Sequence, residues 1–94
     1  MEQFKIAVIY KAKSKEARET FLSEIYQSVV NDIRQEKGCI KYDYYLSVDD
    51  ETKIVLYEIW ESREHQKIHM TQPHMQTSMA IKAKYIDSVE IKEI

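Results

Sequence analysis

Residues 4–11, Phe-Lys-Ile-Ala-Val-Ile-Tyr-Lys, constrain the fold of this chain more than any other stretch. Every second residue from Phe4 to Tyr10 is large and apolar, which is the period of a β-strand. The positions between them include Ala7 and Ile9, so both faces of the strand carry apolar side chains. Such a strand is predicted to lie inside a sheet, with a neighbour on each side.

The segment after this strand predicts a helix over residues 15–36. Ser14 is a suitable N-cap, and Gly38 can end the helix in a left-handed conformation. Apolar residues recur at helical spacing, at Leu22, Ile25, Tyr26, Val29 and Ile33. The strand is therefore followed by a helix with one apolar face.

Three further strands are predicted, two of them as a hairpin. Cys39–Ser47 and Lys53–Trp60 are rich in tyrosine and isoleucine, and the polar residues 48–52 join them. Residues 86–94 form the last strand. A second helix lies between the hairpin and this strand, and Ser62 caps it. Pro73 should interrupt it near residues 70–72, and the helix restarts at Pro73 and runs to about residue 84.

The resulting order, β-α-β-β-α-β, predicts an α+β protein with a ferredoxin-like fold. In that fold a four-stranded antiparallel sheet carries both helices on one face. Apolar side chains on both faces of the first and third strands would leave the other face bare. We therefore predict a symmetric homodimer packed sheet against sheet, a dimeric α/β barrel, with residues 1–94 forming a single domain.

The composition of the 94 residues excludes several classes of function. The net charge is −2 with no basic stripe, so we expect no nucleic-acid partner. A single glycine and a single proline exclude glycine-rich phosphate loops, and a single cysteine excludes an intrachain disulfide. No apolar run approaches the length of a membrane span, and no signal peptide is visible, so we expect a cytoplasmic protein without membrane contact.

The histidines are the first candidates for chemistry. His65 and His69 share a helix face at the spacing of zinc-binding pairs, but the intervening residues lack the glutamate of the His-Glu-x-x-His motif. We predict no metal site and expect His65 to be solvated and His74 to be a capping or loop residue. His69 lies where the helix breaks, and it is either a catalytic base or a structural histidine.

The hairpin strands carry several aromatic residues, of which most are expected to pack: Tyr42, Tyr44, Tyr45, Tyr57 and Trp60. Glu58 shares a strand face with Leu56 and Trp60. If buried alone, its carboxyl would have a raised pKa; otherwise it forms an ion pair with a lysine or arginine, and the dimer partner could supply that residue.

The chain carries a series of short motifs: residues 36–42, Glu-Lys-Gly-Cys-Ile-Lys-Tyr; residues 54–62, Ile-Val-Leu-Tyr-Glu-Ile-Trp-Glu-Ser; and His69 followed by residues 72–74, Gln-Pro-His. This series resembles the antibiotic biosynthesis monooxygenase family. The resemblance covers nearly the whole chain in the same order. It implies a ferredoxin-like fold, a homodimer, and a hydrophobic pocket between the sheet and the helices. It also implies oxidation of a small phenolic or quinol substrate by molecular oxygen, with neither a metal nor an organic cofactor.

The same resemblance implies the site residues. His69 would be the base, with Trp60 and Tyr57 as an aromatic wall, and the substrate-binding positions would be Tyr42, Tyr57, Glu58 and His74. Heme-degrading relatives add an asparagine on the first strand, which this chain lacks.

Two alternative functions remain. Residues 71–74 also resemble a branch of the family that isomerises a phosphorylated sugar-derived diketone, a reaction that needs a phosphate-binding cation not evident here. The third possibility is a non-catalytic module that binds a small ligand.

Overall fold

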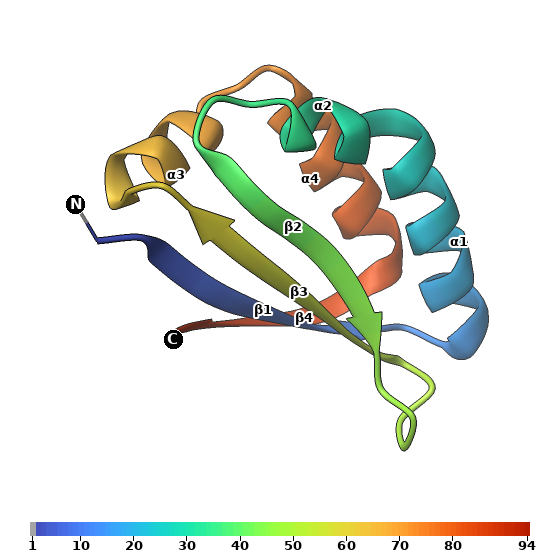
Figure 1. Ribbon diagram of the computed structural model, residues 1–94. Coiled ribbons are helices and arrows are strands. Elements are labelled where there is room, and N and C mark those ends of the chain that lie inside the picture. Colours follow the sequence, from blue (N-terminus) through green and yellow to red (C-terminus); the bar gives the residue numbers. More distant parts are fainter. Residues whose placement is uncertain (1) are drawn as a thin grey trace.

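The computed structural model describes residues 2–94 (Figure 1). Its elements are β1 (Phe4–Ala12), α1 (Lys15–Ile25), the π-helical segment η1 (Tyr26–Val30), α2 (Asn31–Arg34), β2 (Cys39–Leu46), β3 (Lys53–Trp60), α3 (Arg63–His69), α4 (His74–Tyr85) and β4 (Ile86–Glu93).

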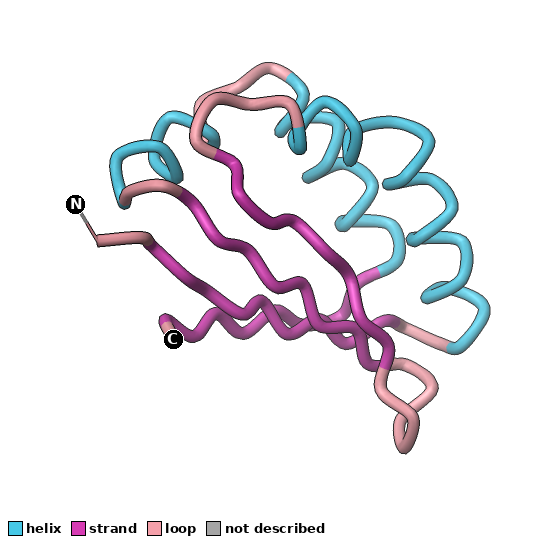
Figure 2. The backbone as a smooth tube through the Cα atoms, viewed as in Figure 1, coloured by secondary structure: helices cyan, strands magenta, loops and turns pink. Residues whose placement is uncertain are grey.

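The four strands form one antiparallel sheet in the order β2-β3-β1-β4, so β1 is an inner strand, as its sequence predicts. Val8 of β1 lies opposite Leu56 of β3 on one side and Ile91 of β4 on the other. The helices gather on one face of this sheet and leave the other face uncovered (Figures 1 and 2). The predicted ferredoxin-like fold is confirmed.

The first predicted helix is interrupted by η1. Ser14 caps it as expected, since its Oγ accepts the N–H of Ala17 at 3.0 Å. The apolar residues Phe21, Ile25, Val29 and Ile33 follow one another at steps of four, and all are buried. Steps of four drift around an α-helix, and the wider turns of a π-helical segment reduce that drift. The segment therefore keeps this face of the helix on the sheet.

The second helix breaks where Pro73 predicts. Ser62 accepts the N–H of His65 at 3.3 Å, and α3 then ends at His69. Pro73 is the N-cap of α4 and not its first residue, one position from the prediction. As a result, His69 is the last residue of one helix and His74 the first residue of the next.

Gly38 turns the chain from the first helical layer into β2, with φ of +87°. Its carbonyl accepts the N–H of Glu61 at 2.8 Å, and a side chain at this position would collide with the ring of His65. His65 also lies 2.7 Å from the Oγ of Ser62 through Nδ1. The expectation that His65 is solvated was wrong, because it packs under this turn.

Strand alternation gives the sheet two different faces. The face under the helices supplies most of the core, whose buried apolar residues are Ile6, Val8, Tyr10, Phe21, Ile25, Val29, Val30, Ile33, Tyr42, Ile54, Leu56, Trp60, Met75 and Ile81. The uncovered face carries a half-buried apolar patch that consists of Ala7, Ile9, Val55, Tyr57 and Ile59. We call this patch the open face. Among the described residues, no helix has the length and apolar character needed to cross a membrane.

Candidate functional site

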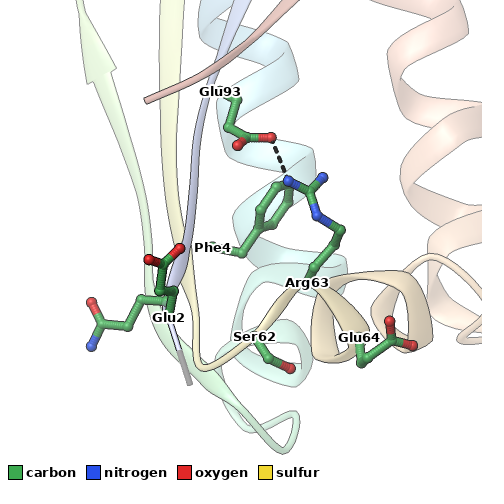
Figure 3. Close-up of a pocket in the computed structure, with 7 residues that line it drawn as sticks. Glu2, Phe4, Ser62, Arg63, Glu64 and Glu93 are labelled. Carbon is green, nitrogen blue, oxygen red and sulfur yellow. Dashed lines mark hydrogen bonds and ion pairs between the residues drawn. The ribbon is translucent and has the colours of Figure 1, made fainter.

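A surface hollow of about 310 Å³ lies beside the start of β1 (Figure 3). The guanidinium of Arg63 stands over the ring of Phe4 at 4.4 Å and donates a hydrogen bond to Glu93 at 2.8 Å. These contacts tie the start of α3 to both β1 and β4. The residues predicted for the site do not line this hollow, and we interpret it as a structural junction.

A second cavity, of about 130 Å³, lies between the sheet and the helices α3 and α4. We call it the inner cavity. The residues of chemical interest that line it are Tyr42, Glu58, His69, Met70, Met75 and Lys82. The family resemblance predicts a pocket in this layer, and three of the predicted site residues, Tyr42, Glu58 and His69, face it.

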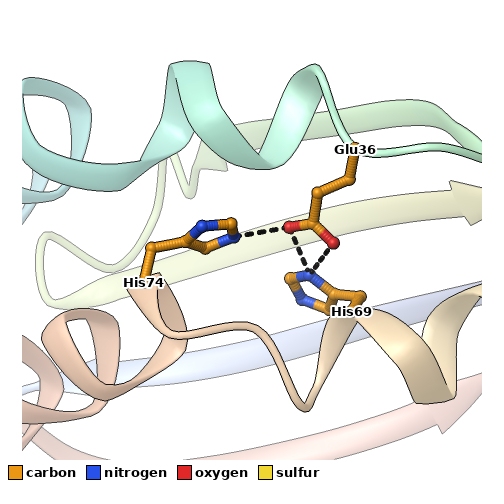
Figure 4. A group of neighbouring side chains, drawn as sticks. All are labelled: Glu36, His69 and His74. Carbon is orange, nitrogen blue, oxygen red and sulfur yellow. Dashed lines mark hydrogen bonds and ion pairs between the residues drawn. The ribbon is translucent and has the colours of Figure 1, made fainter.

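Beside this cavity, the carboxylate of Glu36 bridges two histidines (Figure 4). One oxygen lies 2.9 Å from Nδ1 of His69 and 2.6 Å from Nε2 of His74, and the other lies 3.1 Å from Nδ1 of His69. The side chain of His69 is 2% exposed and that of Glu36 is 11% exposed. The three side chains come from the turn before β2, the end of α3 and the start of α4.

This arrangement assigns the protons of the His69 ring. An ionised carboxylate can only accept hydrogen bonds, so Nδ1 of His69 must donate to Glu36. A neutral imidazole then keeps its lone pair on Nε2, which has no hydrogen-bond partner among residues 2–94. His69 also lines the inner cavity. The pair therefore has the geometry of a base oriented by a carboxylate.

The indole of Trp60 packs against the imidazole of His69. The two ring centroids lie 4.6 Å apart, and Trp60 is fully buried. Its Nε1 donates to Oε1 of Glu58 at 2.9 Å. The ring of Tyr42 lies 6.0 Å from that of His69, edge on. Five predicted residues, Tyr42, Glu58, Trp60, His69 and His74, thus belong to one connected cluster.

Glu58 is buried on the helix side of the sheet, opposite Ile6. Burial raises the pKa of its carboxyl, and the hydrogen bond from Trp60 offsets part of this rise. No ion pair involves Glu58 within the described part of the chain. Of the two alternatives predicted for Glu58, the raised pKa is therefore the one supported within the chain, and an ion pair across the dimer stays a prediction.

Tyr57 lies on the opposite face of the sheet. It pairs with Ala7 and Asp43, and the ammonium of Lys41 lies 5.7 Å from its ring centroid. Tyr57 therefore cannot form a wall with Trp60 in the inner cavity of the same chain, and that part of the site prediction was wrong. Successive residues of a strand point to opposite faces, and three positions separate Tyr57 from Trp60.

The tyrosines of the cavity stay protonated at neutral pH. Burial is the main cause that raises the pKa of Tyr42 and of Tyr10 well above the usual value. Both hydroxyls are therefore neutral groups that can donate a hydrogen bond.

Glu36, His69 and His74 also have the donor types of a metal site. Two ligands on a tetrahedral zinc lie about 3.3 Å apart, given bonds of about 2.0–2.1 Å. Here the carboxylate oxygen lies 2.9 Å and 2.6 Å from the two ring nitrogens, which are hydrogen-bond distances. An ion would have to displace two ring protons and push Glu36 back.

Sequence reasoning missed the roles of two residues at this site. Glu36 was noted only as the first residue of a family motif, with no role assigned to it, and Lys82 was not considered. Lys82 follows the buried Ile81 on α4 and lines the inner cavity. Neither position carries a local signal, because both depend on how the helices pack over the sheet.

Comparison with known proteins identifies the family of this fold and site. Residues 6–80 match the antibiotic biosynthesis monooxygenase (ABM) family. The chain belongs to this family. "Putative monooxygenase YcnE" of Bacillus subtilis is 38% identical over 65 residues, which cover 69% of this chain and 67% of that protein.

Two further matches extend the comparison. "Uncharacterized protein YjcS" of Bacillus subtilis is 39% identical over 49 residues, or 52% of this chain, and the match spans only about half (47%) of that protein. A solved structure from Nitrosomonas europaea, described as a "Putative antibiotic biosynthesis monooxygenase", superposes with a TM-score of 0.88 at 22% identity, over 98% of this chain and 88% of that one. The structural match establishes the fold, and the family match supports monooxygenase chemistry.

Proposed function

We propose that this ABM protein is a cofactor-independent monooxygenase that acts on a small quinol-type aromatic substrate. The observation that carries the proposal is the Glu36–His69 pair beside a cavity of about 130 Å³. This volume is close to that of an apolar cavity of about 150 Å³ that holds one benzene ring in another protein, so it is on the scale of a single aromatic ring. A quinol ionises well above neutral pH, and His69 would supply the base that removes its proton.

The reaction then balances without a cofactor. His69 takes the proton of a ring hydroxyl, and the electron-rich anion passes one electron to oxygen. The resulting pair of radicals combines to form a carbon–oxygen bond at the neighbouring ring carbon. Loss of water leaves a hydroxyquinone: one atom of O₂ remains in the product, and the other leaves in the water with two hydrogens of the substrate.

The other residues of the cluster support this step. Glu36 keeps the His69 proton on Nδ1, and Trp60 closes the space behind the imidazole. His74 secures the other side of the Glu36 carboxylate and is a positioning residue in this proposal. Tyr42 and Glu58 would contact the substrate, since both line the inner cavity.

We also propose that the protein is a homodimer that forms through the open face. Ala7, Ile9, Val55 and Ile59 are half-buried in one chain, and Tyr57 lies among them. A second copy would cover this patch with a self-complementary contact, as in the dimeric barrel the family resemblance implies. We propose a cytoplasmic location and no requirement for metal, nucleic acid or membrane.

The isomerase alternative has one observation in its favour, because Lys82 supplies a cation in the inner cavity. A phosphate dianion would, however, meet the Glu58 carboxyl on the same lining. Turnover of a phosphorylated diketone without oxygen uptake would establish the isomerase instead, and saturable binding without turnover would establish the binding module.

Oxygen uptake with a one-ring hydroquinone, measured for the parent and for His69→Ala, tests the proposed function. Loss of the base should lower turnover by about 10²-fold or more. Lys67→Ala is the matched control, since Lys67 is exposed on the same helix. His65 is unsuitable as a control because it packs against Gly38 and Ser62. Equal turnover per folded molecule in His69→Ala would remove His69 from the mechanism.

A further inference from the structure

Lys82 of α4 lines the inner cavity, and its ammonium lies over an aromatic ring. Its Nζ lies 5.3 Å from the ring centroid of Tyr10, which is 2% exposed. Among residues 2–94, no carboxylate lies within ion-pair distance of Nζ, and it makes no hydrogen bond to protein. The contact with the Tyr10 ring is a cation–π interaction, and it leaves the N–H donors of the ammonium with no hydrogen-bond acceptor among residues 2–94, so they can bind a ligand.

Glu58 faces the same cavity with part of its carboxyl unused. Oε1 accepts the indole N–H of Trp60, whereas no hydrogen bond to Oε2 occurs in the described structure. The charge of Glu58 is the one that acts on Lys82, and it opposes the effect of burial, which lowers the pKa of that ammonium. The other titratable groups on the cavity wall are Tyr10, Tyr42 and His69.

We infer that Lys82 and Glu58 form the recognition pair of the inner cavity, for an aromatic ring that carries one ionised oxygen and a second hydroxyl. The ammonium of Lys82 receives the ionised oxygen. The free oxygen of Glu58 accepts the hydrogen bond of the second hydroxyl. This inference rests on the proposed function for the aromatic nature of the ligand, and it narrows the substrate class to the monoanion of a dihydroxyarene.

The pair would also assist the proposed chemistry. Removal of a proton by His69 places a negative charge on the ring, in a cavity whose walls are mostly apolar. An opposite charge within about 4–6 Å lowers the pKa of an acid by about 1–3 units, and in this cavity that acid is the bound ligand. Lys82 would therefore make the first step easier, while Glu58 fixes which hydroxyl remains protonated.

The inference can be tested with 4-nitrocatechol, a dihydroxyarene whose anion absorbs at a longer wavelength than its neutral form. The titration is carried out without oxygen, so its result does not depend on turnover. In the parent, the bound ligand should ionise at a pH at least about one unit below that of free ligand. Lys82→Met should abolish this shift and weaken binding by about tenfold or more, whereas Lys84→Met, an exposed site on the same helix, should change neither.

Glu58→Gln separates the two roles, because its amide oxygen can still accept the Trp60 N–H. Glu58→Gln should weaken the binding of 4-nitrocatechol more than the binding of 4-nitrophenol, which lacks the second hydroxyl. The melting temperature of Lys82→Met should stay close to that of the parent, since methionine keeps an apolar stem beside Tyr10 and Lys82 makes no hydrogen bond or ion pair within residues 2–94. An unshifted ligand pKa in the parent would overturn the inference. So would a shift that survives in Lys82→Met, or displacement of the ligand by inorganic phosphate through Lys82.

The two proposals fail in different ways. A shifted ligand pKa with no oxygen uptake from any quinol would leave the recognition pair standing and remove the monooxygenase. Oxygen uptake that is unchanged in Lys82→Met, together with an unshifted ligand pKa, would keep the monooxygenase and remove the pair.

Discussion

Replacing Glu36 by alanine should uncouple the His69 imidazole from its orienting carboxylate. The carboxylate now contacts Nδ1 of His69 at 2.9 Å and Nε2 of His74 at 2.6 Å. Once it is gone, His69 can carry its proton on either ring nitrogen. The ring can also rotate about its side-chain bonds, so a smaller share of molecules presents an unprotonated Nε2 to the cavity.

The size of the effect follows from the burial of the two partners. The side chain of His69 is 2% exposed, so its N–H would be left without an acceptor, at a cost of about 1–3 kcal/mol. The side chain of His74 is 22% exposed and can reach water, so the loss of its contact with Glu36 costs less free energy. A net loss of about 2 kcal/mol should lower the melting temperature by about 8–16 °C in a domain of this size. Turnover should fall by about 10²-fold or more if orientation of the base limits the reaction.

The assay combines thermal melting with oxygen uptake per folded molecule. His74→Ala is the matched control, because it removes the other contact of Glu36 but leaves the His69 contact in place, and it should retain most of the activity. Formate added to Glu36→Ala should restore part of the turnover by returning a carboxylate to the space. If Glu36→Ala melts lower but turns over normally, Glu36 is a structural residue and the orienting argument is refuted.

Four further predictions follow from the described contacts. Ile59→Lys places a charge in the open face and should change the light-scattering mass from about twice 11.3 kDa to a single 11.3 kDa chain, whereas an unchanged mass places the interface elsewhere. Dialysis against a chelator should leave oxygen uptake unchanged, and a loss that zinc or iron restores would contradict this. Glu58→Gln should raise the unfolding free energy at neutral pH but not near pH 4. Because the folded-state pKa of Glu58 is raised by burial, its contribution is full at low pH and declines as pH rises, so a pH-independent difference would exclude this cause. Burial, aided by the charge of Glu36, raises the pKa of Cys39 to about 11, so a disulfide reagent at neutral pH should react about 100-fold more slowly than with the unfolded chain, and equal rates would argue against this shift.

Local rules predicted the elements of this fold well. The two-residue period of Phe4–Tyr10, the caps at Ser14 and Ser62, and the break before Pro73 each depend on neighbouring residues alone. The π-helical segment was not predicted, because it depends on how the helix packs against the sheet under it. Three apolar steps of four residues, from Phe21 to Ile33, are equally consistent with an α-helix when the sequence is considered by itself.

The sequence predicted the candidate site only where residue type and strand alternation were enough to place a side chain. His69 and Trp60 lie in contact in the structure, and their catalytic roles stay predictions; the predicted wall of Trp60 with Tyr57 ignored the strand alternation that places these two residues on opposite faces. The role of Glu36 depends on its contact with His69, which lies 33 positions further along the chain. The position of Lys82 on a helix does not show from sequence alone whether its side chain faces a cavity. Those contacts are decided by the packing of α3 and α4 over the sheet.

The two faces of the sheet also separate the two proposed properties of the molecule. On β3, Glu58 and Trp60 point toward the helices, while Tyr57 and Ile59 point to the open face. A substitution that empties the inner cavity should therefore leave the dimer intact. A substitution on the open face reaches His69 only through the backbone of β3, so its effect on turnover should be smaller than its effect on assembly. Because neighbouring residues of one strand serve opposite surfaces, paired variants such as Glu58→Gln and Ile59→Lys can test catalysis and assembly independently.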